Sequence, residues 1–443
     1  MSKNESTLPL PPGNMGLPLI GETFAFLRDM GGFSLQRAQG GTITKTNLFG
    51  RPTIVMSGAE AMRFVLSHEG AYFQGEFPPS TVRLLGQGSI SVVQGATHQN
   101  RRKVLQQVFG HKQLATAVPE MDRIAQEHLA KWVKEGTFAF CPKMNEYAFH
   151  VACALILGDE SKVQVWKDHF QSWTSGLFSM PINLPFTAFG RAYRSRKALL
   201  ELIDSAIATR KNLDDPTDAL GVLLTARDEN GESLAHGEIA DQLLTLLFAG
   251  HETSASALGS FGLLMTRHPD VLEKLRQEQK NLAHSGPFTV EVIRQMPYMD
   301  QVMKEVLRFI PPVGGGFRKV IADCEFGGYR IPKDWRVLYS IGSTHYNAAH
   351  FTDPERFDPD RFNPERAEDK KTRFSWIPFG GGPRICLGME YARLEMAVLG
   401  ARLVREYEWT ALPGQDLSIE VLPTPRPKSG LRVEFKERAR TGY

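Results

Sequence analysis

The feature that most constrains this chain is a glycine-rich loop with one cysteine, Phe379-Gly380-Gly381-Gly382-Pro383-Arg384-Ile385-Cys386-Leu387-Gly388. An apolar helical pattern follows it at once, over residues 389–403. A thiolate is a strong, soft metal ligand, and nearby backbone N–H groups hold its negative charge. Glycines let the backbone turn tightly around the sulfur, and the N-terminus of the next helix adds a favourable dipole. The loop therefore predicts a metal ligand at Cys386; the alternative is a turn around a buried structural cysteine.

The longest helical pattern covers residues 239–267. It is apolar on all sides, which is typical of a helix buried through the middle of a fold. Gly250 lies in its interior, where glycine costs about 1 kcal/mol relative to alanine, and a ligand crossing the helix would explain it. Thr253 could bond its own helix or that ligand, and Glu252 could pass protons towards it. The alternative is a kinked core helix in which the threonine bonds a carbonyl of its own helix.

Composition and charge limit the partners of the chain. With 52 Lys and Arg against 49 Asp and Glu, the net charge is +3, which is too balanced for nucleic acid as the main partner. The four cysteines form no CxxC pair and no zinc-like spacing, so we expect thiols in a reducing cytoplasm. Residues 1–10 are mainly polar and no apolar run approaches about 20 residues, so we expect neither a signal peptide nor a membrane span.

The cysteine loop resembles the haem-binding signature of the cytochrome P-450 family, Phe-x-x-Gly-x-Arg-x-Cys-x-Gly, at every fixed position. Residues 249–253, Ala-Gly-His-Glu-Thr, resemble the family's oxygen-activation motif, and residues 11–18 resemble the proline-rich hinge that follows the membrane anchor of microsomal members. This resemblance implies a mainly α fold with a smaller β lobe and a long central helix over the haem. We expect one catalytic domain, residues 1–443, in which residues 1–18 form the hinge without an anchor, as in soluble, cytoplasmic, bacterial-type members.

The resemblance also implies a haem b cofactor with Cys386 as its axial thiolate ligand, an arrangement that favours O–O cleavage. By family position, His98, Arg102, Arg318 and Arg384 bind the haem propionates, and His98 stands where the family usually has Trp. The alternative for Arg102 is a solvated basic helix. The remaining residues expected at the cofactor are Ala249, Gly250, Phe379 and Gly380.

A Glu-x-x-Arg pair that is buried in the family is present here as Glu305 and Arg308. In the family this pair ties to a Pro-Glu-Arg-Phe segment, which corresponds here to residues 354–357. Glu305, Arg308 and Arg356 are therefore expected to hold the cysteine loop in place rather than to do chemistry. An exposed pair of this kind would contribute only about 0.2–0.5 kcal/mol.

The substrate pocket is expected to be apolar. In the family a loop roofs the pocket and a mobile lid covers it, and these correspond here to residues 72–94 and 173–189. A third stretch, residues 311–318, contains three consecutive glycines that would leave space beside the haem. The candidate substrate contacts are Phe77, Ile90, Trp173, Phe178, Val313 and Phe317. Ordinary loop-anchoring or core positions are the alternative for the first four.

The implied reaction inserts one atom of O₂ into a C–H bond of an apolar substrate, using two electrons supplied from outside. Thr253 and Glu252 are the expected catalytic pair. No flavin or iron–sulfur fingerprint occurs, so the electrons must come from a separate protein, for which we expect a ferredoxin with its reductase. The basic residues that could face this donor, or could be surface charges without a partner, are Arg101, Lys103, Lys112, Arg393 and Arg402.

Residues 307–318, together with His98, look most like the retinoid-hydroxylating branch, which comprises the vertebrate retinoic-acid hydroxylases and a similar cyanobacterial enzyme. Fold-level analogy does not fix a substrate, so retinoic acid or a related apocarotenoid is the expectation and a fatty acid or terpenoid the alternative. The intact Glu252-Thr253 pair argues against an isomerase or dehydratase of lipid hydroperoxides. A non-enzymatic haem sensor would normally carry an output domain, for which no room remains.

Overall fold

The computed structural model describes residues 7–210, 214 and 216–438. The chain divides into two compact units. The smaller unit comprises Met1–Glu76, Lys304–Cys386 and Val421–Pro425, and the larger comprises Phe77–Met303, Leu387–Glu420 and Arg426–Tyr443.

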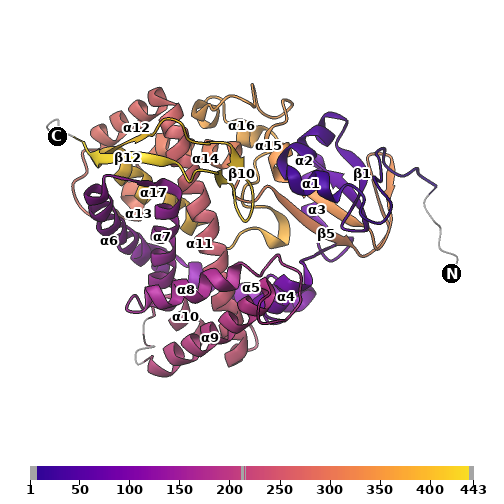
Figure 1. The fold of residues 1–443 in the computed structure, drawn as a ribbon, viewed down its shortest axis with the longest axis horizontal. Helices are drawn as coiled ribbons and strands as arrows, with labels where there is room; N and C mark the ends of the chain where they lie inside the picture. The colour runs from indigo at the N-terminus through magenta and orange to yellow at the C-terminus, as the bar shows by residue number, and fades with distance from the viewer. Residues whose placement is uncertain (1–6, 211–213, 215, 439–443) are drawn as a thin grey trace. The chain divides into compact units, whose positions relative to one another are not determined.

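A five-stranded sheet with the order β1-β2-β8-β5-β3 forms the centre of the smaller unit (Figure 1). Its strands are β1 (Ile43–Leu48), β2 (Arg51–Met56), β8 (Arg336–Ser340), β5 (Gly315–Val320) and β3 (Phe73–Gly75). β1 and β2 form an antiparallel hairpin through Phe49 and Gly50, both with positive φ, whereas β2 and β8 run parallel. Ile54 and Val337 of the sheet belong to one buried apolar cluster with Val65 of α3 (Ala59–Ser67), which fixes this helix on the sheet.

Short elements complete the smaller unit. They are α1 (Thr23–Arg28), α2 (Met30–Gln39), β6 (Cys324–Phe326), β7 (Tyr329–Ile331), α15 (Ile341–His345), η3 (Pro359–Phe362), α16 (Glu368–Lys371) and η4 (Gly382–Arg384). The cysteine loop follows α16 and contains η4, and it belongs to this unit as far as Cys386.

The larger unit is organised around the 32-residue helix α11 (His236–Arg267), which packs against the shorter helix α7 (Phe140–Ala152) (Figure 1). Gly262 makes this contact possible, because a Cβ there would lie 2.3 Å from Cε1 of Phe140. The leucines of α11 at 243, 244 and 247 are fully buried. The helix is thus surrounded by protein along much of its length, as its all-round apolar sequence predicts.

The other elements of the larger unit pack around these two helices. The helices are α4 (Pro79–Leu85), α5 (Gly95–Gln106), η1 (Gln107–Phe109), α6 (His111–Glu135), η2 (Cys153–Leu157), α8 (Val163–Thr174), α9 (Ala188–Thr209), α10 (Ala219–Thr225), α12 (Pro269–Leu282), α13 (Val290–Ile293) and α17 (Met389–Glu406). The strands are β4 (Thr137–Ala139), β9 (Tyr407–Ala411) and β12 (Arg432–Glu437), which form one sheet, and β10 (Ile419–Glu420) and β11 (Arg426–Pro427), which pair separately. The boundary between the units falls within α14 (Pro297–Phe309).

The predicted fold class, mainly α with a smaller β region, is confirmed. The hairpin at residues 43–56 and the long helix are where the sequence places them, and α11 begins a few residues earlier than predicted. The expectation of one catalytic domain stays a prediction. In the part of the chain that the structure describes, we find no helix with both the length and the hydropathy needed to cross a membrane.

Candidate active site

The cysteine loop presents its thiol to solvent. Cys386 is exposed, whereas the other three cysteines of the chain are buried. The backbone N–H of Cys386 donates to the carbonyl oxygen of Phe379 at 2.9 Å, and that of Gly380 donates to the carbonyl oxygen of Ile377, also at 2.9 Å. These bonds fold the loop back on itself. Since Cys386 is exposed, the alternative of a buried structural cysteine does not hold.

A glycine anchors this loop against α3. Gly382 has φ +65°, and a Cβ at this position would lie 1.9 Å from the carbonyl oxygen of Leu66 at the end of that helix. Only glycine allows the two backbones to approach so closely. The glycines of the loop therefore serve two purposes, the turn around the cysteine and its packing on the rest of the unit.

Two of the four predicted propionate ligands meet in the smaller unit. Nε of Arg384 lies 2.5 Å from Oε1 of Glu69, and Nε of Arg318 lies 3.4 Å from Oε2 of the same carboxylate. The guanidinium of Arg318 also lies over the ring of Tyr339, and its buried Nε has no hydrogen-bond acceptor among the described residues. Two guanidinium groups thus lie against one carboxylate and make this part of the unit cationic. This arrangement fits a haem that carries carboxylates.

The expected structural network is present, with one correction. Arg308 forms two hydrogen bonds with the carboxylate of Glu305, at 2.7 and 2.8 Å, and both side chains are fully buried. The second arginine on this carboxylate is Arg361, whose Nε lies 3.1 and 3.2 Å from its two oxygens. Arg356 was expected there, but its side chain is exposed. Its carbonyl oxygen accepts from both Arg308 and Arg361, so the segment 354–357 is tied to the network as expected.

The misassignment has a physical cause. The chain carries two similar segments, Pro354-Glu355-Arg356-Phe357 and Pro359-Asp360-Arg361-Phe362. The second forms the 3₁₀ turn η3, which turns Arg361 inwards, where its Nη1 also binds Glu368 at 2.9 Å. The duplicated Pro-x-Arg-Phe pattern was the signal that could have found Arg361.

The oxygen-activation motif lies in an open part of α11. Ala249 is exposed, and a Cβ on Gly250 would meet no atom within 4 Å. The hydroxyl of Thr253 donates to the carbonyl oxygen of Ala249 at 2.7 Å. Burial raises the pKa of Glu252, and the positive charge of Arg426 partly opposes this shift. The middle of α11 therefore combines free space, a hydroxyl and a carboxyl whose pKa is raised by burial.

Two buried acid–base groups, one within the motif and one on α17, were not predicted to have a role. The ring of His251 lies between Phe149 and Phe170, and burial lowers its pKa to about 3, so it stays neutral. Glu395 of α17 is fully buried, and burial raises its pKa to about 8, although a hydrogen bond with Ser254 acts in the opposite direction. His251 lies in the apolar helix whose burial was predicted, whereas no sequence pattern indicates the burial of Glu395.

The basic residues of α5 have different environments. His98 and Arg101 are buried, and Arg102 is half-buried. Arg101 forms an ion pair with Glu238 at the start of α11. Adjacent residues of a helix point in different directions. Arg101, which was expected at the surface, is therefore buried, whereas the proposed propionate ligand Arg102 is half-buried.

The expected docking face for an electron donor therefore needs correction. Arg101 is internal, and so is Arg402, which is 8% exposed and binds Asp122 at 2.6 Å. Of the other three residues, Lys103 and Lys112 are exposed. Arg393 forms an ion pair with Asp300 at 2.7 Å.

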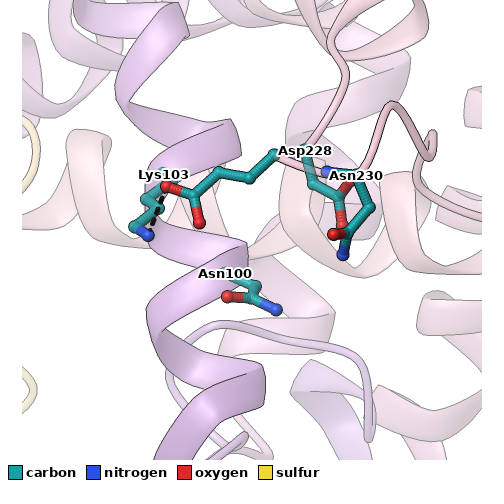
Figure 2. Close-up of a pocket in the computed structure, with 5 residues that line it drawn as sticks. Asn100, Lys103, Asp228 and Asn230 are labelled. Carbon is teal, nitrogen blue, oxygen red and sulfur yellow. Dashed lines mark hydrogen bonds and ion pairs between the residues drawn. The ribbon is translucent and has the colours of Figure 1, made fainter.

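Lys103 borders a small polar notch between α5 and the turn at residues 228–231 (Figure 2). Its Nζ lies 2.6 Å from a carboxylate oxygen of Glu229, and Asp228 binds the backbone N–H of Asn230 at 2.8 Å. The notch has room for about 20 Å³, roughly one water molecule. It is too small for a substrate.

The candidate substrate contacts fall into two groups. In the larger unit, Ile90 and Trp173 belong to the buried core, and the indole N–H of Trp173 donates to the carbonyl oxygen of Leu84 at 3.0 Å. Phe77 and Phe178 are 39% and 57% exposed. For Trp173 the core alternative accounts for its full set of contacts.

In the smaller unit, Val313 is 42% exposed, and Phe317 packs on an apolar cluster that includes Phe26. Of the three glycines between them, only Gly314 faces open space. A Cβ on Gly315 would lie 2.2 Å from the carbonyl oxygen of Tyr339, because β5 and β8 pair there. The expectation that all three glycines leave space beside the haem was wrong at Gly315 and Gly316, where Tyr339 fills the position of a side chain.

A surface hollow of about 380 Å³ lies in the larger unit, between α4 and the segment that precedes and begins α9. Its lining residues are Val82, Arg83, Gln87, Asn183, Phe189 and Tyr193. None of these was predicted as a substrate contact, although all except Tyr193 belong to the two stretches expected to roof and cover the pocket. Its volume lies within the range of small-ligand sites, about 300–1,000 Å³.

The mainly α fold, the exposed cysteine of the glycine-rich loop and the open middle of α11 are each features that the resemblance to a haem-thiolate oxygenase predicts. The family model for Cytochrome P450 matches residues 11–431, and the chain belongs to this family. It is a P450 monooxygenase, an oxidoreductase, and the family implies a haem with thiolate-ligated iron, O₂ and a redox partner.

Similar proteins agree with the predicted branch. The chain is 46% identical over 435 residues to the protein named cytochrome P450 120 of Synechocystis sp., and the match covers 98% of both chains. It is 38% identical to cytochrome P450 26B1 of Xenopus tropicalis, over 97% of this chain and 87% of that relative. A solved structure described as retinoic acid bound cyanobacterial CYP120A1 matches with a TM-score of 0.92 at 45% identity, and covers 98% of this chain. The predicted resemblance to the retinoid-hydroxylating branch is confirmed.

Proposed function

We propose that this P450 hydroxylates a retinoid, either retinoic acid or a related apocarotenoid. The observation that carries the proposal is the similarity, at 45% identity over 98% of the chain, to a structure solved with retinoic acid bound. The exposed apolar residues Phe77, Phe178 and Val313 support it, since each buried methylene of a polyene contributes about 0.8 kcal/mol. A fatty acid or a terpenoid is the second candidate.

The residues of the chain would divide the work as follows. Cys386 would ligate the iron of a haem b. The haem propionates would be bound by Arg318, Arg384, His98 and Arg102. The bound haem would supply the oxygen-activating chemistry. Ala249 and Gly250 of α11, with Phe379 and Gly380 of the cysteine loop, would lie against the cofactor.

Proton delivery would fall to the middle of α11. The hydroxyl of Thr253 would give up its hydrogen bond to the carbonyl oxygen of Ala249 and donate a hydrogen bond to O₂ instead. Glu252, whose pKa is raised, would supply a proton to the Thr253 hydroxyl. The two electrons would come from a ferredoxin and its reductase. Lys103 and Lys112 would be the first cations to examine on its docking face, because both are exposed.

A spectral titration tests the substrate class. All-trans retinoic acid should shift the Soret band of the ferric enzyme with a micromolar or lower dissociation constant. Reconstitution with a ferredoxin chain should then give a product heavier by one oxygen atom. Tighter binding and faster oxidation of a fatty acid or terpenoid would overturn the retinoid assignment and leave the monooxygenase class intact.

A further inference from the structure

One buried histidine joins the structural network of the smaller unit to the cysteine loop. His345 is the last residue of α15 and is fully buried. Its Nδ1 lies 3.2 Å from the carbonyl oxygen of Arg308, and its Nε2 accepts the backbone N–H of Ile377 at 2.9 Å. Both ring nitrogens are therefore used, and both partners are main-chain groups.

The two partners determine the protonation state of the ring. A carbonyl oxygen only accepts and an amide N–H only donates, so the hydrogen must be on Nδ1 and the lone pair on Nε2. Burial and the positive charge of Arg308 lower the pKa of His345 to about 3, which agrees with a neutral ring. In a protonated ring, the Nε2–H of His345 would face the backbone N–H of Ile377, so that two donors would lie opposite each other.

Each end of this bridge continues into the site. Arg308 belongs to the buried network with Glu305 and Arg361. On the other side, the carbonyl oxygen of Ile377 accepts the N–H of Gly380 at 2.9 Å. The carbonyl oxygen of Phe379 in turn accepts the N–H of Cys386 at 2.9 Å. His345 thus stands between the network and Ile377, which lies two residues before the cysteine loop.

We propose that His345 is a positioning residue for the Cys386 thiolate: it fixes the point at which the cysteine loop begins, and so the direction in which the loop presents its sulfur. The proposal rests on the proposed role of Cys386 as the iron ligand. An apolar side chain of similar size would fill the same space. It would, however, leave the N–H of Ile377 and the carbonyl oxygen of Arg308 buried without partners, and such groups relax by moving.

The test compares the full-length, haem-loaded wild type with His345→Phe and His345→Gln. His350→Phe is the control, because Nε2 of His350 accepts only from Ala59, outside the cysteine loop. In His345→Phe, the amides of Ile377 and Gly380 should exchange hydrogen about tenfold faster, the factor that one net hydrogen bond contributes. Peptides from α11 should keep the wild-type rate, which separates this effect from general loss of stability.

A spectroscopic measurement accompanies the exchange experiment. On mild warming, the reduced carbon-monoxide complex of His345→Phe should lose its red-shifted thiolate band at least fivefold faster than the wild type. His345→Gln, whose side-chain amide can still accept from Ile377, should lie between them, and His350→Phe should match the wild type.

The outcomes distinguish this proposal from the proposed function. The positioning role would be overturned if the amide of Ile377 in His345→Phe exchanged hydrogen at the wild-type rate. It would also be overturned if hydrogen exchange became faster by the same factor in every peptide. A wild-type enzyme without any thiolate band would overturn the assignment of Cys386 instead, and the exchange rates would then decide the bridge alone.

Discussion

Thr253 donates its hydroxyl to the carbonyl oxygen of Ala249, one turn earlier in α11, across 2.7 Å. This is the bond expected of a threonine in an ordinary helix. Yet Ala249 is exposed and Gly250 borders empty space, so the same hydroxyl lies at the edge of a gap. The Thr253 hydroxyl therefore has a hydrogen-bond acceptor in its own helix, and it can rotate from this acceptor towards a ligand in the gap.

The first prediction concerns this threonine. Thr253→Ala removes one bond within its own helix, so unfolding free energy should change by no more than about 1 kcal/mol. Product formed per NAD(P)H consumed should nevertheless fall about tenfold or more, because positioned proton donors contribute about 10²–10⁴-fold. Thr253→Ser, which keeps the hydroxyl, is the control. Unchanged coupling in the alanine variant would leave Thr253 with a helical role only.

The second prediction separates two arginines that the sequence does not distinguish. Arg361→Met leaves the buried carboxylate of Glu305 with one cation fewer and should cost about 3–5 kcal/mol of unfolding free energy. Arg356→Met removes an exposed side chain and should change it by less than about 0.5 kcal/mol. Urea denaturation of both variants provides the measurement, and equal effects would contradict the network described here.

The third prediction concerns pH. The pKa of Glu395 is raised to about 8 in the folded protein, whereas an unfolded glutamate has a pKa of about 4.3. Between these values the folded state holds a proton that the unfolded state has lost, so this contribution to stability falls as pH rises and is lost once pH passes 8. It should fall by up to about 1.4 kcal/mol per pH unit.

Glu395→Gln is neutral at every pH and should lack this dependence. The difference in unfolding free energy between the variant and the wild type should therefore grow from pH 5 to pH 8 and then level off. Glu390→Gln, at an exposed position of the same helix, should show no such trend. A constant difference for Glu395→Gln would mean that the buried carboxyl is ionised.

The fourth prediction concerns the head group of a retinoid. Arg318 and Arg384 already bind Glu69, and Arg83 at the surface hollow is exposed, so a substrate carboxylate would gain only a weak ion pair. Retinal, retinol and retinoic acid should bind with dissociation constants within about tenfold, since about 1.4 kcal/mol is the most that such a contact adds.

Spectral titrations of the three retinoids provide this measurement. Arg83→Gln should narrow any preference for the acid, and Arg63→Gln, at an exposed position of α3, should leave it unchanged. A hundredfold preference for retinoic acid would show a dedicated basic residue in the pocket.

Local patterns carried most of what the sequence could predict. The apolar run of α11, the hairpin turn at Phe49 and the signature around Cys386 are each contained in a few consecutive residues. The misses depend on contacts between distant segments. Arg101 is buried because Glu238, far along the chain, pairs with it, and Glu69 stands in no pattern that foretells two arginine partners.

The choice between Arg356 and Arg361 shows the same limit. Both stand in a Pro-x-Arg-Phe segment, and only the turn at η3 decides which guanidinium enters the core. Likewise, three consecutive glycines suggest open space, but the pairing of β5 with β8 fills it at Gly315.

The most direct test of the account is the difference spectrum of the reduced protein with carbon monoxide, recorded for the wild type and for Cys386→Ala. The wild type should show the red-shifted Soret band that a thiolate ligand produces, and the variant should lose it. Cys141→Ala, at a buried cysteine of the larger unit, should retain the band. A normal thiolate band in Cys386→Ala, or none in the wild type, would contradict the assignment of Cys386 as the iron ligand.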